Sequence, residues 1–116
     1  MSIAPTASQQ ITAEVTSWAR VEAGPGRRGE FGFKVGRREI GHLHGDHAAH
    51  FFFDKDVWDE LIEQGRVVPH PVFPDRRGPA ARRIETQDDV RDVIELMRLN
   101  YDDALARAGA PARAGA

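Results

Sequence analysis

The chain has 116 residues and a formal net charge of -2 at pH 7, which suits one domain and gives no overall attraction to nucleic acid or to an anionic membrane. The lack of cysteine excludes disulfides, thiolate nucleophiles and Cys-based metal sites. No stretch approaches the ~20 apolar residues that span a bilayer, and residues 1–10 lack the pattern of a secretory signal, so we expect a cytoplasmic protein that does not enter membranes.

We expect residues 1–7 to be disordered and a helix to follow from Ser8 to about residue 20. The helix prediction depends on apolar residues at helical spacing, namely Ile11, Val15 and Trp18. A short strand at 21–23 and a loop at 24–29 are expected next, because the glycines and the proline of the loop interrupt both kinds of regular structure.

Residues 30–53 alternate between apolar and polar side chains, which predicts three antiparallel strands joined by tight turns. The turns are expected at Gly36-Arg37 and Gly45-Asp46, where glycine readily adopts a positive φ. If each turn has two residues, Lys34 faces Glu39 across the first hairpin, and opposite charges meet.

The same register distributes the histidines of the second hairpin. It places His44 opposite His47, with His42 beside them, at one end of the sheet face that carries the phenylalanines. His50 would lie on the other face together with Leu43, and that face is expected to be largely wet.

A second helix is expected to begin at Asp54 and to end at Gly65, a residue suited to a left-handed C-cap. Residues 66–79 contain four prolines and should be extended or turned over the surface. Residues 80–85 are expected to form a last strand at an edge of the sheet.

Thr86 and Asp89 have the spacing of a capping box, which should open the longest helix. Apolar spacing carries this helix to about residue 107, and residues 108–116 should be a disordered tail. The order of elements predicts one domain over residues 8–107 of the α+β class: a two-layer sandwich in which helices pack on one face of an antiparallel meander sheet.

These elements also carry motifs that resemble a known family. Residues 30–101 resemble the bacterial luciferase family, or luciferase domain. The shared motifs are Gly-Arg-Arg-Glu-Ile-Gly-His-Leu-His-Gly-Asp at 36–46, Pro69-His70 with Val72 and Pro74, and Leu-Met-Arg-Leu-Asn-Tyr at 96–101. The element order is also similar to the MmcQ/YjbR-like domains, which have a CyaY-like sandwich.

The resemblance implies four ligand-binding positions, which are His42, His44, Asp46 and His70. It implies no flavin, luciferin or light emission, and the chain has no Gly-x-Gly-x-x-Gly signature for flavin or NAD.

The histidines of the second hairpin indicate a metal site. His42 and His44 lie ~6.6 Å apart by strand rise, and His47 would lie across from His44 with Cβ atoms ~5 Å apart. His42, His44 and His47 could therefore bind one divalent metal such as Zn, with His70 or Asp46 as fourth ligand or support. Hydrogen-bonded structural histidines are the alternative interpretation.

We thus expect a small non-enzymatic module that binds a ligand or metal. One alternative is a histidine-dependent hydrolase or other acid/base enzyme at the same place, although no nucleophile motif accompanies it. Another is anion or nucleic-acid binding through arginine pairs, for which the scarcity of interleaved aromatics gives nucleic acid little support. The uncovered sheet face leaves a homodimer open. The arginine pairs are Arg27-Arg28, Arg37-Arg38, Arg76-Arg77 and Arg82-Arg83.

Overall fold

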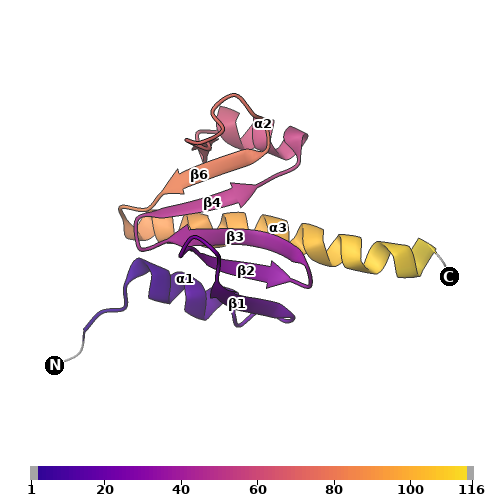
Figure 1. The fold of residues 1–116 in the computed structure, drawn as a ribbon, viewed down its shortest axis with the longest axis horizontal. Helices are drawn as coiled ribbons and strands as arrows, with labels where there is room; N and C mark the ends of the chain where they lie inside the picture. The colour runs from indigo at the N-terminus through magenta and orange to yellow at the C-terminus, as the bar shows by residue number, and fades with distance from the viewer. Residues whose placement is uncertain (1–2, 115–116) are drawn as a thin grey trace.

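The computed structural model describes residues 3–114, with side chains to residue 109. These residues form three helices and a six-stranded antiparallel sheet (Figure 1), which confirms the α+β prediction. The elements in chain order are α1 (Ala7–Val15), β1 (Val21–Pro25), β2 (Phe31–Val35), β3 (Arg38–His44), β4 (Ala48–Phe52), α2 (Lys55–Glu63), β5 (Val68–Pro69), β6 (Pro79–Arg83) and α3 (Gln87–Ala114).

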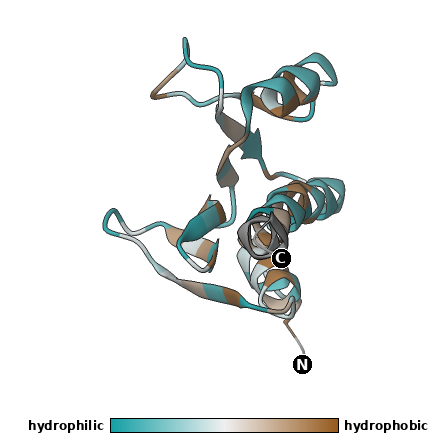
Figure 2. Cartoon of the chain, turned by 90° about the vertical axis from the view of Figure 1, so that its right-hand side faces the viewer, coloured by the Kyte–Doolittle hydropathy of each residue, from teal (hydrophilic) through white to brown (hydrophobic). Residues whose placement is uncertain are grey.

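The first four strands of the sheet form a meander, the last two strands are not in chain order, and the helices cover one face of the sheet. The strand order is β1-β2-β3-β4-β6-β5, so β6 lies between β4 and the two-residue β5. The expectation that the last strand lies at an edge is therefore wrong. Figure 2 shows the helices on one side of the sheet and two projecting loops on the other.

The helix ends follow local capping chemistry. Thr6, rather than Ser8, is the N-cap of α1 and forms a capping box with Gln9. The predicted capping box of α3 is confirmed, because the Asp89 N–H donates to Thr86 Oγ1 at 3.2 Å and the Thr86 N–H donates to Asp89 Oδ2 at 3.0 Å. Gly65, with φ of 72°, follows the last turn of α2 as predicted.

Two helix boundaries differ from the expectation. α1 ends at Val15 instead of near residue 20, and α3 continues through Ala114 instead of ending near residue 107. Residues 1–2 and 115–116 of the expected disordered ends lie outside the described residues.

The pairing of β2 with β3 contains a β-bulge. Lys34 pairs with Glu39 as predicted, but the register then shifts, so that Phe33 pairs with Gly41 rather than with Ile40. Two consecutive residues of β3 therefore oppose one residue of β2. Ile40 is fully buried in the core beneath this bulge.

Gly41 allows α3 to approach the bulge closely. Its φ is 156°, and a Cβ built on it would lie 2.6 Å from the Sδ atom of Met97. Because Ile40 and Gly41 both face the helices, the next side chains of β3 change sides. His42 and His44 consequently lie on the face opposite the helices, and their predicted position on the phenylalanine face is wrong.

The turn between β3 and β4 has three residues, 45–47, and not two. His44 consequently pairs with Ala48, and His42 pairs directly with His50. The predicted pairing of His44 with His47 is wrong, and the extra turn residue brings His50 to the face of His42 and His44.

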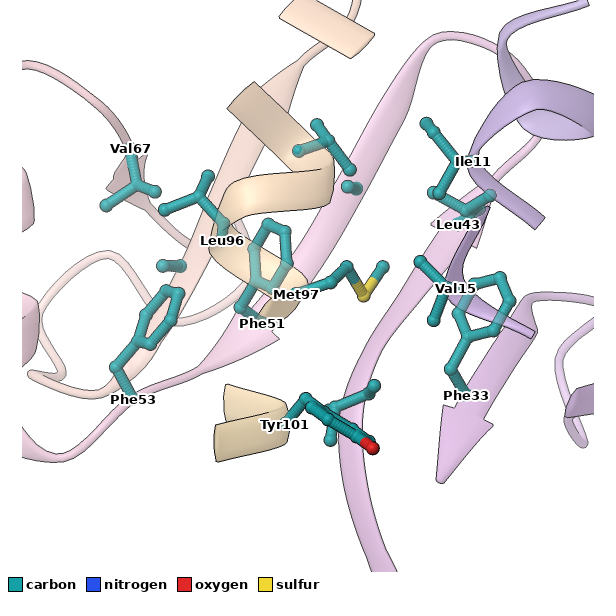
Figure 3. Close-up of a cluster of buried hydrophobic side chains, with 14 of the residues drawn as sticks. Ile11, Val15, Phe33, Leu43, Phe51, Phe53, Val67, Leu96, Met97 and Tyr101 are labelled. Carbon is teal, nitrogen blue, oxygen red and sulfur yellow. The ribbon is translucent and has the colours of Figure 1, made fainter. Parts of the chain in front are cut away.

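The core lies between the sheet and the helices. Figure 3 shows Met97 of α3 between Phe51 of β4 and Val15 of α1. Leu43, which was expected on the wet face, is 1% exposed and belongs to this core. Each fully buried side chain of this size contributes ~1.5–3 kcal/mol, so the core holds the sheet rigidly enough to position side chains on its other face.

Candidate metal centre

Four of the five histidines meet on the helix-free face of the sheet. His42 and His44 extend from β3, His50 from β4, and His70 follows β5. The ring centroids of His42 and His44 are 5.0 Å apart, and those of His42 and His50 are 5.3 Å apart. The ring centroid of His50 lies 4.3 Å from that of His44 and 4.3 Å from that of His70. Residues far apart in the sequence therefore form one imidazole cluster.

Three of these side chains have the spacing of a metal-binding group. One potential ligand nitrogen from each of His42, His44 and His50 lies within 4.8 Å of the others. Nitrogen atoms around a tetrahedral zinc ion are about 3.4 Å apart, given Zn–N bonds of about 2.0–2.1 Å. Small side-chain rotations that move each nitrogen by about 1 Å would therefore allow all three nitrogens to bind one ion.

Glu39 fixes the tautomer of His42. Its Oε2 atom lies 2.9 Å from His42 Nδ1, and an ionised carboxylate can only accept, so the proton of His42 is on Nδ1. The lone pair of Nε2 is then available to a metal. Carboxylates hold metal-binding histidines in this way, and they raise the basicity of the ligand nitrogen.

His50 is half-buried, and its Nδ1 atom is fully covered. Burial lowers its pKa to about 4, and the neighbouring imidazoles of His70 and His44 act in the same direction. His50 is therefore neutral at pH 7. Its Nδ1 atom is buried and has no hydrogen-bond partner among the described residues, which is a costly state for a polar atom unless something binds it.

His70 lies next to the cluster but is engaged elsewhere. Its Nδ1 atom accepts a hydrogen bond from the backbone N–H of Val72 at 3.1 Å, and its own backbone N–H donates to the carbonyl of Pro79 at 3.2 Å. The neutral ring then carries its proton on Nε2, so neither nitrogen is a ligand in this geometry. Burial lowers the pKa of His70.

Asp46 and His47 are not part of this cluster. The Asp46 carboxylate accepts a hydrogen bond from the Ser8 N–H at 2.9 Å, and this bond holds the Asp46 pKa below its ordinary value. Asp46 thus ties the first turn of α1 to the hairpin. His47 is exposed in the turn, and its carbonyl accepts a hydrogen bond from the Ile84 N–H.

The cluster lines a groove of about 760 Å³ on the helix-free face. The loop after β1 forms one wall with Arg27 and Arg28, and the loop after His70 contributes Val72 and Phe73. Figure 2 shows these two loops on the side of the sheet away from the helices. A cluster with a groove above it is accessible to small ligands.

Comparisons with known proteins place the chain in one family. Searches of curated proteins and of solved structures found no match, and the similarity in element order to the MmcQ/YjbR-like domains stays a prediction. No helix in the described part of the chain has the length and apolar character needed to cross a membrane. A family model described as "Luciferase domain" matches residues 37–100, a span that contains the whole imidazole cluster and more than half of the chain. The protein therefore belongs to the Luciferase-domain family.

Proposed function

We propose that this domain binds one divalent transition metal, with zinc as the first candidate, through His42, His44 and His50. The observation that carries the proposal is the convergence of three imidazole nitrogens within 4.8 Å on adjacent strands. Imidazole ligands suit zinc, copper and nickel, whereas calcium and magnesium prefer oxygen.

The surroundings of the three side chains support a metal in preference to a purely structural cluster. His42 has the carboxylate support that metal-binding histidines usually have. His50 is neutral at pH 7 and carries a buried nitrogen without a partner. A buried nitrogen of a purely structural histidine would normally have a hydrogen-bond partner.

The expected role is that of a binding module without catalytic turnover. The alternative is an enzyme, and one observation favours it: three protein ligands beside an open groove would leave a fourth coordination position for water or substrate, as in catalytic zinc sites. A hydrolase screen of the zinc-loaded protein separates the two roles. Turnover that disappears in the His42→Ala/His44→Ala variant would establish the enzyme.

Calorimetric titration of the metal-free protein with Zn²⁺ tests the binding itself. We expect one ion per chain with a Kd below about 1 µM. His42→Ala, His44→Ala and His50→Ala should each weaken binding by more than about 100-fold, since even the partners of metal ligands contribute about 10- to 100-fold.

His47→Ala is the matched control, because His47 lies in the same hairpin but outside the cluster. It should leave the affinity unchanged. Binding weaker than micromolar, or an equal loss in His47→Ala and His44→Ala, would overturn the proposal.

A further inference from the structure

The groove above the cluster has the features of a site for a small organic anion, and this inference depends on the proposed metal site. Three imidazoles bind a divalent ion as neutral ligands and leave its double positive charge in place. Glu39, bonded to His42, is the carboxylate next to the ligand set. A metal held in this way attracts a negatively charged ligand to its remaining position.

His70 does not fill that position in the described geometry. The Val72 N–H occupies its Nδ1, so its Nε2 carries the proton. The ring centroid of His70 still lies 4.3 Å from that of His50. The fourth position is therefore available to a molecule from the groove, and His70 can donate a hydrogen bond to it.

Arg27 and Arg28 supply positive charge on the groove wall. Both line the groove, are exposed and form no salt bridge with a residue that the structure describes. Guanidinium groups bind carboxylates through paired hydrogen bonds. These two arginines are therefore available to an anion that enters the groove.

Three other arginines of the predicted pairs, Arg76, Arg77 and Arg82, have other contacts. Arg83 is exposed but does not line the groove. Arg82 pairs with Asp89 and Asp92 on the helix side of the sheet, and Arg77 pairs with Asp59. Arg76 lies over the ring of Phe73. The structure thus favours one of the four arginine pairs that the sequence offers for anion binding.

Three carboxylates also line the groove, those of Glu22, Glu30 and Glu39. Glu39 is hydrogen-bonded to His42. In the strand register, Lys34 lies between Glu22 of β1 and Glu39 of β3, so a positive charge lies beside both carboxylates. Glu30 accepts a long hydrogen bond from the Arg28 N–H within its own loop. None of these three carboxylates neutralises the guanidinium groups of Arg27 and Arg28 through a described salt bridge.

The floor of the groove has room for the body of a ligand. Gly24 pairs with Gly32, which pairs with His42, so bare backbone continues the row of the histidines. On the other wall, Val72 is 67% exposed and Phe73 is 41% exposed. The volume of about 760 Å³ is within the range of small-molecule sites.

We infer that the groove binds a small organic carboxylate with an apolar body. The carboxylate lies between the metal and the guanidinium groups of Arg27 and Arg28, and the apolar body rests on Val72 and Phe73. The test uses the protein loaded with Co²⁺, whose visible absorption changes when a ligand of the ion is exchanged. Benzoate and acetate are titrated separately, and inorganic phosphate serves as a comparison.

Benzoate should change the Co²⁺ spectrum and bind more tightly than acetate or phosphate. Arg27→Ala/Arg28→Ala should weaken benzoate about tenfold or more, whereas the matched control Arg37→Ala/Arg38→Ala should not, because that turn lies outside the groove. Phe73→Ala should weaken benzoate about three- to tenfold and leave acetate unchanged.

A filled groove gives an independent check. Gly24→Leu should block benzoate but not Co²⁺, because a Cβ at Gly24 meets no atom within 4 Å. Unchanged Co²⁺ affinity in each variant shows that the fold is intact. If Co²⁺ does not bind, both the metal proposal and this inference fail. If Co²⁺ binds but benzoate leaves the spectrum unchanged, or acts equally on both arginine variants, this inference alone is overturned.

Discussion

Replacement of Gly41 by alanine should destabilise the fold by about 2–4 kcal/mol. The added Cβ would lie 2.6 Å from Met97 Sδ, 2.8 Å from Met97 Cε and 3.1 Å from a ring carbon of Phe51. Overpacking of a close-packed core costs typically about 1–3 kcal/mol. The φ of 156° adds strain of about 1 kcal/mol for a residue with a side chain.

Urea unfolding of Gly41→Ala and Gly45→Ala separates the two contributions. Gly45 also has a positive φ, of 60°, but a Cβ there meets nothing within 4 Å. Backbone strain alone should therefore lower the free energy of unfolding of Gly45→Ala, by about 1–2 kcal/mol. In a double-mutant cycle, Met97→Ala should offset part of the cost of Gly41→Ala, because the shortened side chain makes room. A loss below about 0.5 kcal/mol in Gly41→Ala, or additive effects in the cycle, would refute the described packing of the bulge.

Two further predictions concern the carboxylates. The side chain of Arg82 and the N–H of Glu85 lower the pKa of Asp89 to about 2, so its stabilisation is present above the ordinary pKa near 3.8 and is lost as the pH falls towards 2. In urea titrations, Asp89→Asn should therefore be less stable than the wild type by about 1 kcal/mol at pH 6, after allowance for solvent screening. This difference should be clearly smaller at pH 2, where half of the Asp89 side chains are protonated, and a pH-independent difference would contradict this reasoning. Glu39→Gln should weaken Zn²⁺ binding about 10- to 100-fold in calorimetry, because a neutral amide oxygen is a weaker acceptor for His42 Nδ1–H and no longer raises the basicity of the other ring nitrogen. An unchanged affinity would show that the negative charge of Glu39 has no such role.

The sequence predicted the class and order of elements because each depends on local patterns. Alternation over residues 30–53 and apolar stripes at helical spacing appear in any short window. The Thr86–Asp89 capping box and the pairing of Lys34 with Glu39 were predicted for the same reason, and the structure contains both.

The face of the histidines could not be predicted in this way, because it depends on single-residue irregularities. The bulge at Gly41 moves His42 and His44 to the helix-free face. The third turn residue leaves His47 in the turn and places His50 beside His42. A slip of one residue inverts every side chain that follows it. One signal was present in the sequence. Ile40 and Leu43 are both apolar but three residues apart, so a regular strand could not bury both on one face, and this spacing indicates a bulge between them.

The position of His70 depends on long-range topology. It reaches His50 because β6 lies beside β4 and β5 lies beside β6. The proline-rich residues 66–79 carry no periodic pattern from which this pairing could be derived. The resemblance to the luciferase family pointed to His70, but only the structure shows its bond to the Val72 N–H.

Nitrogen-15 NMR of the histidine side chains during Zn²⁺ addition tests most directly whether three imidazoles on the helix-free face bind a metal. Each ring nitrogen that binds the ion shifts strongly, and each histidine is observed separately. We predict that one equivalent of Zn²⁺ shifts His42, His44 and His50 and leaves His47 in place. A shift of His47 together with His44, or unchanged signals from all of these rings, would contradict the proposed site.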